Sequence, residues 1–413
     1  MKSHFKSMSS TRSVKSITGT AWRAGRLLGF GGIAYVASMS ISAADSGAAD
    51  KLAAVINQYG VSKNFVGVAW VQEGENVLVQ QAFGPANREK NAAHTPDERF
   101  RIASITKLFA ATLVMKAVDE GLVTLDEKVS AYDTELAVEN AQQITLRQLL
   151  QHTSGLPDPA GEDVKDDEIG SFYLAKNTKY ADAKFVIRER MKGALAFTPG
   201  AKFKYNNGDY LVVQRVLERV YKKPFAEILA IKITHPLGLK NTGMLSNDNR
   251  QLKATQPSRA IPKGYELVEG KFKAEPNIAI ENFGAAGAMY SNASDLAKFG
   301  LALTRGKLLS AQSTQIMLTG DSKLGYVALG AWVFPLQLDN AKATSNQPAP
   351  AQPAPRMLSR EGEIGTFKLS LMVDTERPRV ILLMTNQASN PIGAVWMKDG
   401  LMYDLLKAWY QPE

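Results

Sequence analysis

Apolar residues near the start of the chain change from helical to alternating spacing. Residues 51–61, KLAAVINQYGV, have the three- and four-residue spacing of a helix. The segment after them alternates and predicts two strands, at 66–72 and 77–82, with a turn at 73–76. We therefore expect a helix followed by a β-hairpin.

The middle of the chain has mainly helical spacing. One such helix is predicted from Ser104 to Gly121, where the glycine is a plausible end. Other helical segments follow, separated by loops, and they include TLRQLLQ, GDYLVVQRVLERVY and FAEILAIKITHPLGL. These patterns predict a mostly helical block over about 104–270.

The last part returns to strands. A helix is predicted in SNASDLAKFGLAL, where Ser291 or Asn292 precedes Asp295 as a cap. Strands are then predicted in YVALGAWVF, GTFKLSLMVD and RVILLMTN, and a final helix near AVWMKDGLMYDLLKAWY. Strands at both ends predict one sheet built from about 45–103 and 271–413, with the helical block inserted.

One segment does not fit either spacing. Residues 340–356 are rich in proline, alanine and glutamine, and proline cannot donate a hydrogen bond to a neighbouring strand. We expect an exposed, mobile insertion between two strands.

The net charge of +9 is concentrated at the N-terminus. Six of the 49 basic residues precede Asp45, the first acidic residue, so the rest of the chain has 43 basic against 40 acidic residues, a net charge of +3. This balance is too mild and too dispersed for a nucleic-acid partner.

The basic N-terminus resembles an export signal. Its basic, serine-rich start leads to an apolar run at 27–37, which is shorter than the roughly 20 residues of a membrane-spanning helix. Small residues at Ser42 and Ala44 offer a cleavage site, so residues 1–44 are predicted to be a signal peptide and residues 45–413 a single exported, periplasmic domain without an integral membrane part. An uncleaved anchor and a mitochondrial presequence are the alternatives.

Several kinds of site are excluded by composition. The chain has no cysteine, and its four histidines are scattered without acidic neighbours, so we expect no thiol chemistry, metal or other cofactor. The segment GFGGIA at 29–34 matches a dinucleotide-binding fingerprint, but no strand precedes it and it lies in the leader. The oligomeric state is not predicted.

Ser104 and Lys107 are candidates for a nucleophile and its base. If the helix begins near Ser104, its backbone N–H can stabilise an oxyanion, and Lys107 lies one turn further on the same face. Burial and the positive helix end would lower the pKa of Lys107 and allow it to accept a proton. The alternative is a capping serine and a solvent-exposed lysine, but the helix is too apolar to leave much polar surface.

A second motif follows the Pro-Gly turn in FTPGAKFKYNNGDYLVVQRVLERV. Tyr205 and Asn207 are expected on a loop that can direct their side chains into a cleft. With this motif, the chain resembles the penicillin-recognising serine hydrolases, in the branch of class C β-lactamases, D-Ala-D-Ala carboxypeptidases and related esterases. The resemblance covers about residues 52–406 and also rests on FRIASITKLFAATLVMKAVDEGLVTLDEKVSAY, ITLRQLLQHTSGLPD, ITHPLGLKNTGM and GAAGAMYSNASDLAKFGLAL.

The resemblance implies a fold and a mechanism. The fold would be of the α+β type, a mainly antiparallel sheet flanked by helices with a helical subdomain. Ser104 would be acylated, Lys107 would accept its proton, Tyr205 would pass the proton to the leaving group and activate water, and Asn207 would bind near Lys107 and the substrate. His152 resembles the family's structural loop histidine.

The third motif departs from the family. Counting back seven residues from Phe367 gives Arg360, Glu361 and Gly362 in place of the family's Lys-Thr-Gly or His-x-Gly. Arg360 keeps a cation and could pair with Glu361, and the N–H of Glu363 would be a second oxyanion donor. The carboxylates of Glu361 and Glu363 would repel anionic substrates.

The predicted function is therefore an exported serine hydrolase that acts on a small-molecule ester or amide, a peptide or a β-lactam. Esterase, D-Ala peptidase and weak β-lactamase activity stay open, with substrates that lack a carboxylate favoured. The alternative from another class is a binding protein or pseudoenzyme that keeps the fold while its altered third motif has lost turnover.

Overall fold

The computed structural model describes seven stretches of the chain. The predicted signal peptide falls outside them except for residues 43 and 44, and so do residues 340–353 of the predicted insertion. Both stay predictions. The described residues are 43–133, 141–161, 182–245, 261–276, 278–338, 354–393 and 395–411.

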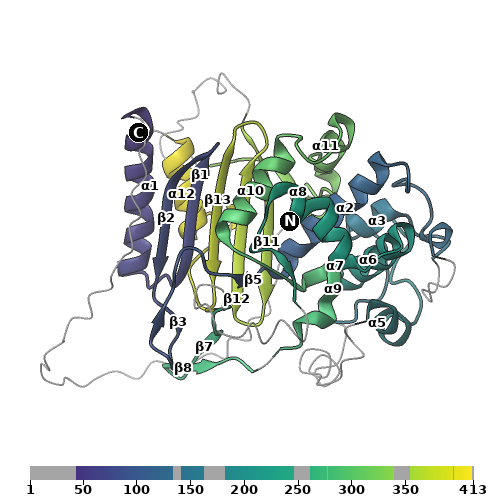
Figure 1. Cartoon of the computed structure of the whole chain (residues 1–413), viewed down its shortest axis with the longest axis horizontal. Helices are drawn as coiled ribbons and strands as arrows, with labels where there is room; N and C mark the ends of the chain where they lie inside the picture. Colours follow the sequence, from purple (N-terminus) through teal and green to yellow (C-terminus); the bar gives the residue numbers. More distant parts are fainter. Residues whose placement is uncertain are drawn as a thin grey trace, which may run out of the picture. The chain divides into compact units, whose positions relative to one another are not determined.

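A six-stranded antiparallel sheet joins the two ends of the domain (Figure 1). Its strand order is β10-β11-β12-β13-β1-β2, and β1 pairs with β13, with Trp70 opposite Leu382. This confirms the predicted hairpin and the sheet assembled from distant segments. The strands are β1 Gly67–Glu73, β2 Asn76–Phe83, β10 Trp332–Pro335, β11 Arg356–Ile364, β12 Phe367–Asp374 and β13 Arg379–Thr385.

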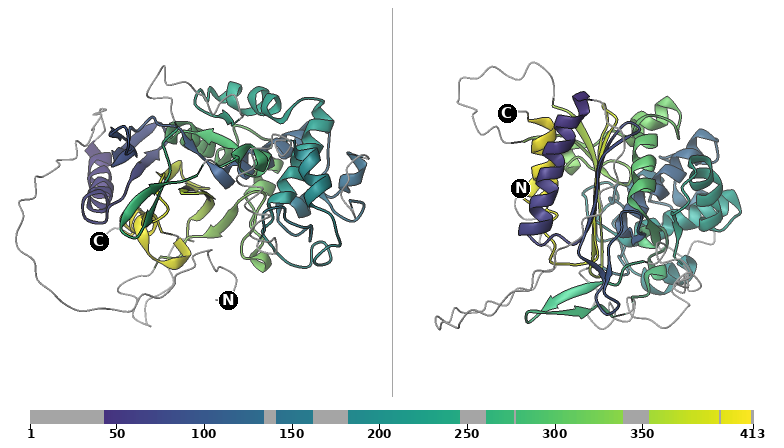
Figure 2. Two further views of the ribbon diagram at one scale, coloured as in Figure 1. Left: turned by 90° about the horizontal axis from the view of Figure 1, so that it is seen from below. Right: turned by 60° about the vertical axis from the view of Figure 1, so that its left-hand side comes forward.

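Two helices cover one face of this sheet. Helix α1, Ala43–Ser62, packs beside the last helix, α12, Gly400–Tyr410, as the right-hand view of Figure 2 shows. Leu52, Ile56 and Leu405 are fully buried in the core between these helices and the sheet. A hydrogen bond of 2.7 Å from Tyr59 to Asp404 also joins the two helices.

The other face packs against a larger helical layer. Helix α10, Ala293–Thr304, lies on the sheet, and Asn292 caps it by accepting a hydrogen bond from the Asp295 N–H, as the sequence predicts. Helix α2, Thr106–Asp119, lies deeper and is buried on nearly all sides, consistent with its apolar sequence. Around it are α3 Leu146–Leu150, α5 Ala183–Arg190, α6 Asn207–Tyr221, α7 Phe225–Leu229, the π-helix η4 Ala230–Thr234, α8 His235–Leu237 and α9 Gly284–Gly287.

The boundaries differ from the prediction in three places. Short strands lie inside the block 104–270, because two- to four-residue strands leave no periodic pattern, and two helices that were not predicted, α9 and α11, follow it. Strand β11 begins at Arg356, which pairs with Pro335, so the predicted insertion ends earlier. The remaining strands are β3 Pro85–Asn87, β4 Ala92–Ala93, β5 Phe100–Arg101, β6 Gly243–Met244, β7 Tyr265–Val268, β8 Lys271–Ala274 and β9 Met289–Ser291; the other helix is α11 Ala311–Met317.

Candidate active site

Ser104 lies in a tight turn between strand β5 and helix α2. The turn is the 3-10 helix η1, Ala103–Ile105, and α2 begins two residues after Ser104 at Thr106, slightly later than predicted. Ala103 has a φ of 46°, which is uncommon for a residue with a side chain and often marks a functional site. The turn leaves the Ser104 side chain half-buried, beside a cavity, rather than inside the helix layer.

Lys107 is fully buried directly behind Ser104. Its Nζ donates to Asn207 Oδ1 at 2.9 Å and to the carbonyl oxygen of Ala286 at 2.7 Å, and it lies 3.2 Å from Ser104 Oγ. This rules out the solvent-exposed lysine. Burial lowers the pKa of Lys107, and the charge of Arg360 acts in the same direction.

These contacts fit both protonation states of Lys107, because an ammonium can donate to all three oxygens and a neutral amine to two of them. An ammonium has three N–H groups, whereas a neutral amine has two and one lone pair. Asn207 Oδ1 and Ala286 O can only accept hydrogen bonds. In the neutral form of Lys107, they therefore accept from both of its N–H groups. The lone pair of Lys107 is then directed at Ser104 Oγ.

Tyr205 also contacts the nucleophile. Its hydroxyl lies 2.6 Å from Ser104 Oγ and accepts a hydrogen bond of 3.1 Å from Arg360 Nη2. Burial opposes ionisation of Tyr205, but the positive charges of Lys107 and Arg360 outweigh it and lower the pKa of Tyr205 to about 8. Ser104 therefore has two proton acceptors within hydrogen-bonding distance.

Arg360 supports the nucleophile and is almost fully buried. Its side chain packs near Trp332, and Nε donates to the Ser104 carbonyl at 2.7 Å. The sequence predicted Arg360 in substrate binding and paired with Glu361. In the described residues its polar contacts are with Ser104 and Tyr205, and Arg360 and Glu361 form no ion pair there.

Gly362 lets β11 approach the nucleophile turn. A Cβ at this position would lie 2.3 Å from the Ile102 carbonyl oxygen, so only glycine fits without displacing backbone. Alternation along the strand places Arg360 and Gly362 on the face toward Ser104 and Glu361 on the other.

A small cavity lies beside Ser104. It has a volume of about 90 Å³, and Glu363 lines it whereas Glu361 does not. Glu363 is exposed and pairs with Lys368 at 3.6 Å. Burial raises the pKa of Glu361 to about 7. The full lining is Ala103, Ser104, Tyr205, Asn207, Phe283, Ala286, Gly287, Glu363 and Ile364.

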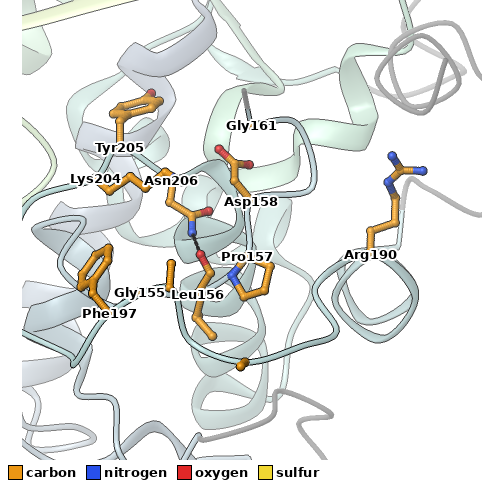
Figure 3. Close-up of a pocket in the computed structure, with 12 residues that line it drawn as sticks. Gly155, Leu156, Pro157, Asp158, Gly161, Arg190, Phe197, Lys204, Tyr205 and Asn206 are labelled. Atoms are coloured by element: carbon orange, nitrogen blue, oxygen red, sulfur yellow. Dashed lines mark hydrogen bonds between the residues drawn. The ribbon is translucent and has the colours of Figure 1, made fainter. Parts of the chain in front are cut away.

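A larger cavity of about 270 Å³ lies behind Tyr205 (Figure 3). It is bordered by the segment from Gly155 to Asp158, by Phe197 and by the cations Arg190 and Lys204. Neither Ser104 nor Lys107 lines it. The smaller cavity is therefore the one where a substrate can meet the reactive groups.

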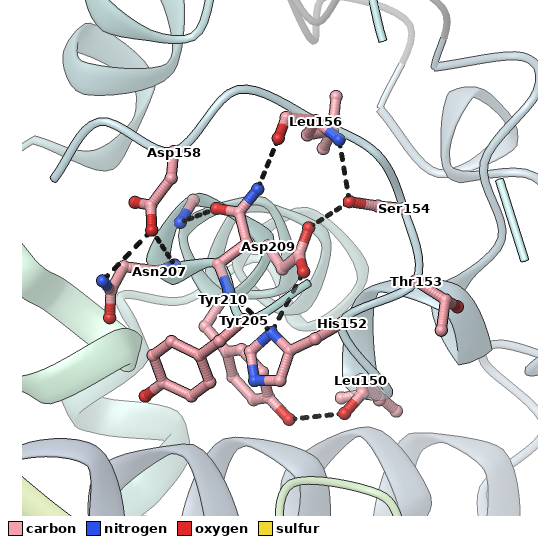
Figure 4. A network of polar contacts seen from close by, with 12 residues as sticks. Leu150, His152, Thr153, Ser154, Leu156, Asp158, Tyr205, Asn207, Asp209 and Tyr210 are labelled. Atoms are coloured by element: carbon pink, nitrogen blue, oxygen red, sulfur yellow. Dashed lines mark hydrogen bonds and ion pairs between the residues drawn. The ribbon is translucent and has the colours of Figure 1, made fainter. Parts of the chain in front are cut away.

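A buried polar network holds the loop that carries Tyr205 (Figure 4). His152 Nδ1 lies 3.1 Å from Asp209 Oδ2, and Ser154 Oγ donates to Asp209 Oδ1 at 2.5 Å. Burial lowers the pKa of His152 and raises that of Asp209, so it favours the neutral form of each group. The His152 and Tyr205 rings are 4.5 Å apart, so the network fixes the position of the tyrosine ring.

The sequence analysis missed three groups at the site. Asp209 and the backbone carbonyl of Ala286 have the contacts given above. The third is Asp158, whose carboxylate accepts hydrogen bonds from Asn207. The segments HTSGLPD and YNNGD contain the two acids beside residues already singled out, but no spacing rule links them to Lys107.

The described residues contain no group of three or more histidine, aspartate or glutamate side chains arranged to hold a metal ion. They also contain no helix that is long and apolar enough to cross a membrane.

This arrangement, a Ser-x-x-Lys turn whose serine contacts the tyrosine of a Tyr-x-Asn loop beside strand β11, defines a serine hydrolase-type site of the β-lactamase and penicillin-binding class. A family model described as Beta-lactamase matches residues 52–396, and the chain belongs to this family. The family and fold predicted from the sequence are thereby confirmed.

Three similar proteins are hydrolases by name. Teichoic acid D-alanine hydrolase of Staphylococcus aureus is 27% identical over 64% of this chain and 60% of its own length. D-amino acid amidase of Ochrobactrum anthropi, solved with D-phenylalanine, has a TM-score of 0.68 and 21% identity over 89% of this chain and all of that one. EstCE1, a hydrolase with promiscuous acyltransferase activity, has a TM-score of 0.69 and 20% identity with the same coverage.

The two solved structures share the fold at this low identity. The chain spans 60–66% of the length of the curated relatives it matches.

Proposed function

We propose that this protein is a serine hydrolase that forms an acyl-enzyme at Ser104 and cleaves an ester or amide. The observation that carries the proposal is the position of Ser104 Oγ, 2.6 Å from Tyr205 OH and 3.2 Å from Lys107 Nζ. A serine alcohol is a weak nucleophile, and an adjacent base that accepts its proton activates it.

The reaction follows from these positions. Ser104 Oγ attacks the substrate carbonyl carbon while its proton passes to Lys107 or Tyr205, and the carbonyl oxygen becomes an oxyanion near the N–H groups of Ser104 and Glu363. Tyr205 returns the proton to the leaving alcohol or amine as the carbonyl–leaving-group bond breaks. Water then attacks the acyl-enzyme, with Tyr205 as the base, and releases the acid.

The cavity supports a short acyl group. Its volume of about 90 Å³ is smaller than the cavity of about 150 Å³ that holds a benzene molecule. The apolar side chains of Phe283 and Ile364 line it, and the carboxylate-bearing Glu363 lies at its edge. A substrate with its own carboxylate at this edge would be repelled.

These features favour short-chain esters and amides over β-lactams and D-Ala-D-Ala termini. D-alanyl esters and D-amino acid amides also fit, since the names of two similar proteins indicate such substrates and these compounds lack the carboxylate. The basic, acid-free leader supports export to the periplasm, which N-terminal sequencing of the fractionated protein would test.

A substrate panel tests the proposal. Nitrophenyl acetate and longer esters, a D-alanyl ester, a D-amino acid amide, nitrocefin and a D-Ala-D-Ala peptide are compared on the wild type and Ser104→Ala. We expect Ser104-dependent hydrolysis of the short esters or amides and a kcat/KM at least tenfold lower for nitrocefin. Efficient nitrocefin turnover would contradict the substrate assignment.

The alternative, a binding protein without turnover, has its own result in the same experiment. A fluorophosphonate that fails to label Ser104, together with no hydrolysis of any substrate in the panel, would favour it.

A further inference from the structure

Asp158 accepts two hydrogen bonds from Asn207, at the start of helix α6, and a third from Ala160. Its Oδ2 accepts from the Asn207 backbone N–H at 3.1 Å and from Asn207 Nδ2 at 3.4 Å (Figure 4). Its Oδ1 accepts from the Ala160 N–H at 3.1 Å. All three contacts come from N–H donors and favour an ionised carboxylate, which only accepts, against the burial that raises the pKa of Asp158. The N-terminus of a 15-residue helix also favours a negative charge.

These bonds determine which end of the Asn207 amide faces Lys107. Because Nδ2 is held by Asp158, the other amide atom, Oδ1, is the one that points to Lys107 Nζ at 2.9 Å. With the amide reversed, Nδ2 would meet the lysine, and two N–H donors would face each other. The lone pair of neutral Lys107 would then lose one of the two acceptors that direct it at Ser104.

The loop that carries Asp158 is itself fixed to α6. Asn206 Nδ2 donates to the Leu156 carbonyl at 2.6 Å, and Asn206 Oδ1 caps the helix by accepting from the Gly208 N–H at 2.7 Å. Asp158 follows two residues after Leu156, so the same loop–helix junction holds Asp158 and Asn207 in register.

We infer that Asp158 is a positioning residue for the hydrolysis: it fixes the Asn207 amide with Oδ1 toward Lys107, and its charge tunes the protonation of that lysine. The inference rests on the proposed function, because it concerns how Lys107 serves Ser104. Asp158 itself does not line the cavity beside Ser104.

The charge of Asp158 should change the pH dependence of the reaction in a defined direction. Burial lowers the pKa of Lys107, while the negative charge of Asp158 acts against this and raises it. Lys107 accepts a proton only when neutral, so the rate rises with pH through its pKa. Removal of the charge at position 158 should therefore move the acidic limb of the rate profile to lower pH.

The experiment measures the rate of Ser104 labelling by a fluorophosphonate, and kcat/KM for a short ester, from pH 5 to 10. For Asp158→Asn we expect a decrease of up to about 100-fold, typical of a misplaced catalytic group, and an acidic limb at lower pH. Asp158→Glu keeps the charge but moves it by one methylene, so the limb should stay near that of the wild type while the rate falls.

A matched control is Asp133→Asn. Asp133 is also buried and accepts from Arg215 at 3.0 Å and Arg219 at 3.1 Å, away from Ser104. Loss of the Asp133 carboxylate should lower the stability of the protein and leave the acidic limb of its pH–rate profile unchanged. Thermal unfolding of each variant shows that folded protein is compared.

A double-mutant cycle with Asn207→Ala completes the test. If Asp158 acts through Asn207, Asp158→Asn should have little further effect on the rate in the Asn207→Ala background. Additive effects, or an unmoved limb in folded Asp158→Asn, overturn the inference while the proposed function stands. A wild type that the fluorophosphonate does not label overturns both.

Discussion

At the scale of single residues, the site is arranged around the proton of Ser104. Two groups can accept it: Lys107, whose pKa is lowered by burial, and Tyr205, whose pKa is lowered to about 8 by the charges of Lys107 and Arg360 despite burial. Because these groups are close, they titrate as a coupled pair. The permanently charged guanidinium of Arg360 favours the ionised form of Tyr205.

The coupled pair predicts a pH profile. Activity needs the deprotonated form of the pair, so kcat/KM should rise with pH through about 8. Tyr205→Phe should reduce kcat by about 100- to 10,000-fold, the usual range for loss of an acid–base group. Ionised Tyr205 raises the pKa of Lys107, so the remaining limb should move to lower pH in this variant.

The measurement is kcat and kcat/KM for a short ester from pH 5 to 10. Tyr290→Phe is the matched control, since this tyrosine is half-buried on β9 and is not among the residues lining the cavity beside Ser104. A folded Tyr205→Phe with wild-type kcat would contradict the assigned role.

At the scale of elements, two close approaches place the reactive groups. Strand β11 lies against the turn η1 at Gly362, and helix α6 brings Asn207 to Lys107 of α2. In β11, the charged residues Arg360, Glu361 and Glu363 interrupt the alternation of apolar and polar positions that predicts a strand. The hydrophobic pattern therefore did not predict a strand there.

The contact at Gly362 predicts a sensitive position. The Cβ of Gly362→Ala would meet the Ile102 carbonyl at 2.3 Å, and this carbonyl also accepts the Ile105 N–H at 3.1 Å in the nucleophile turn. We expect kcat to fall about 100-fold as Ser104 moves, and stability to fall by about 1–3 kcal/mol.

Ester kinetics and urea unfolding measure the two effects. Gly47→Ala is the control, because Gly47 is an exposed residue of α1 with open space at its Cβ position. Gly47→Ala should raise the free energy of unfolding by about 0.5–1 kcal/mol and leave kcat unchanged. An active Gly362→Ala would show that the strand does not need this close approach.

At the scale of the whole domain, the sheet separates two cores. One lies under α1 and α12, and the other surrounds α2 on the face that carries the site. Strand β1, the first in the chain, pairs with β13, the last. The sheet is therefore complete only when residues more than 300 positions apart in the sequence come together. Alternation predicted the strands, but it carries no information about which of them are neighbours.

The separation of the cores predicts an effect on stability without an effect on catalysis. Leu405→Ala removes a fully buried side chain of α12 and should cost about 2–5 kcal/mol in the free energy of unfolding. The kcat of the folded protein should be unchanged, since α12 lies on the sheet face opposite Ser104.

Urea unfolding and ester kinetics test this. Leu267→Ala, at a position 47% exposed, should change stability by no more than about 0.5 kcal/mol. A large loss of kcat in folded Leu405→Ala would instead show that the two cores are coupled.

The sequence by itself determined the family, the order of the main helices and strands, and the pair Ser104 and Lys107 with Tyr205 and Asn207. These depend on local spacing and on motifs that lie within a few residues of one another. Only the tertiary structure decided that Arg360 contacts Ser104 and Tyr205 rather than Glu361, that Glu361 is outside the small cavity, and that Asp158 holds Asn207. The physical reason is that hydrogen bonds and burial between segments 49 to 256 residues apart depend on how those segments pack, which no local pattern encodes.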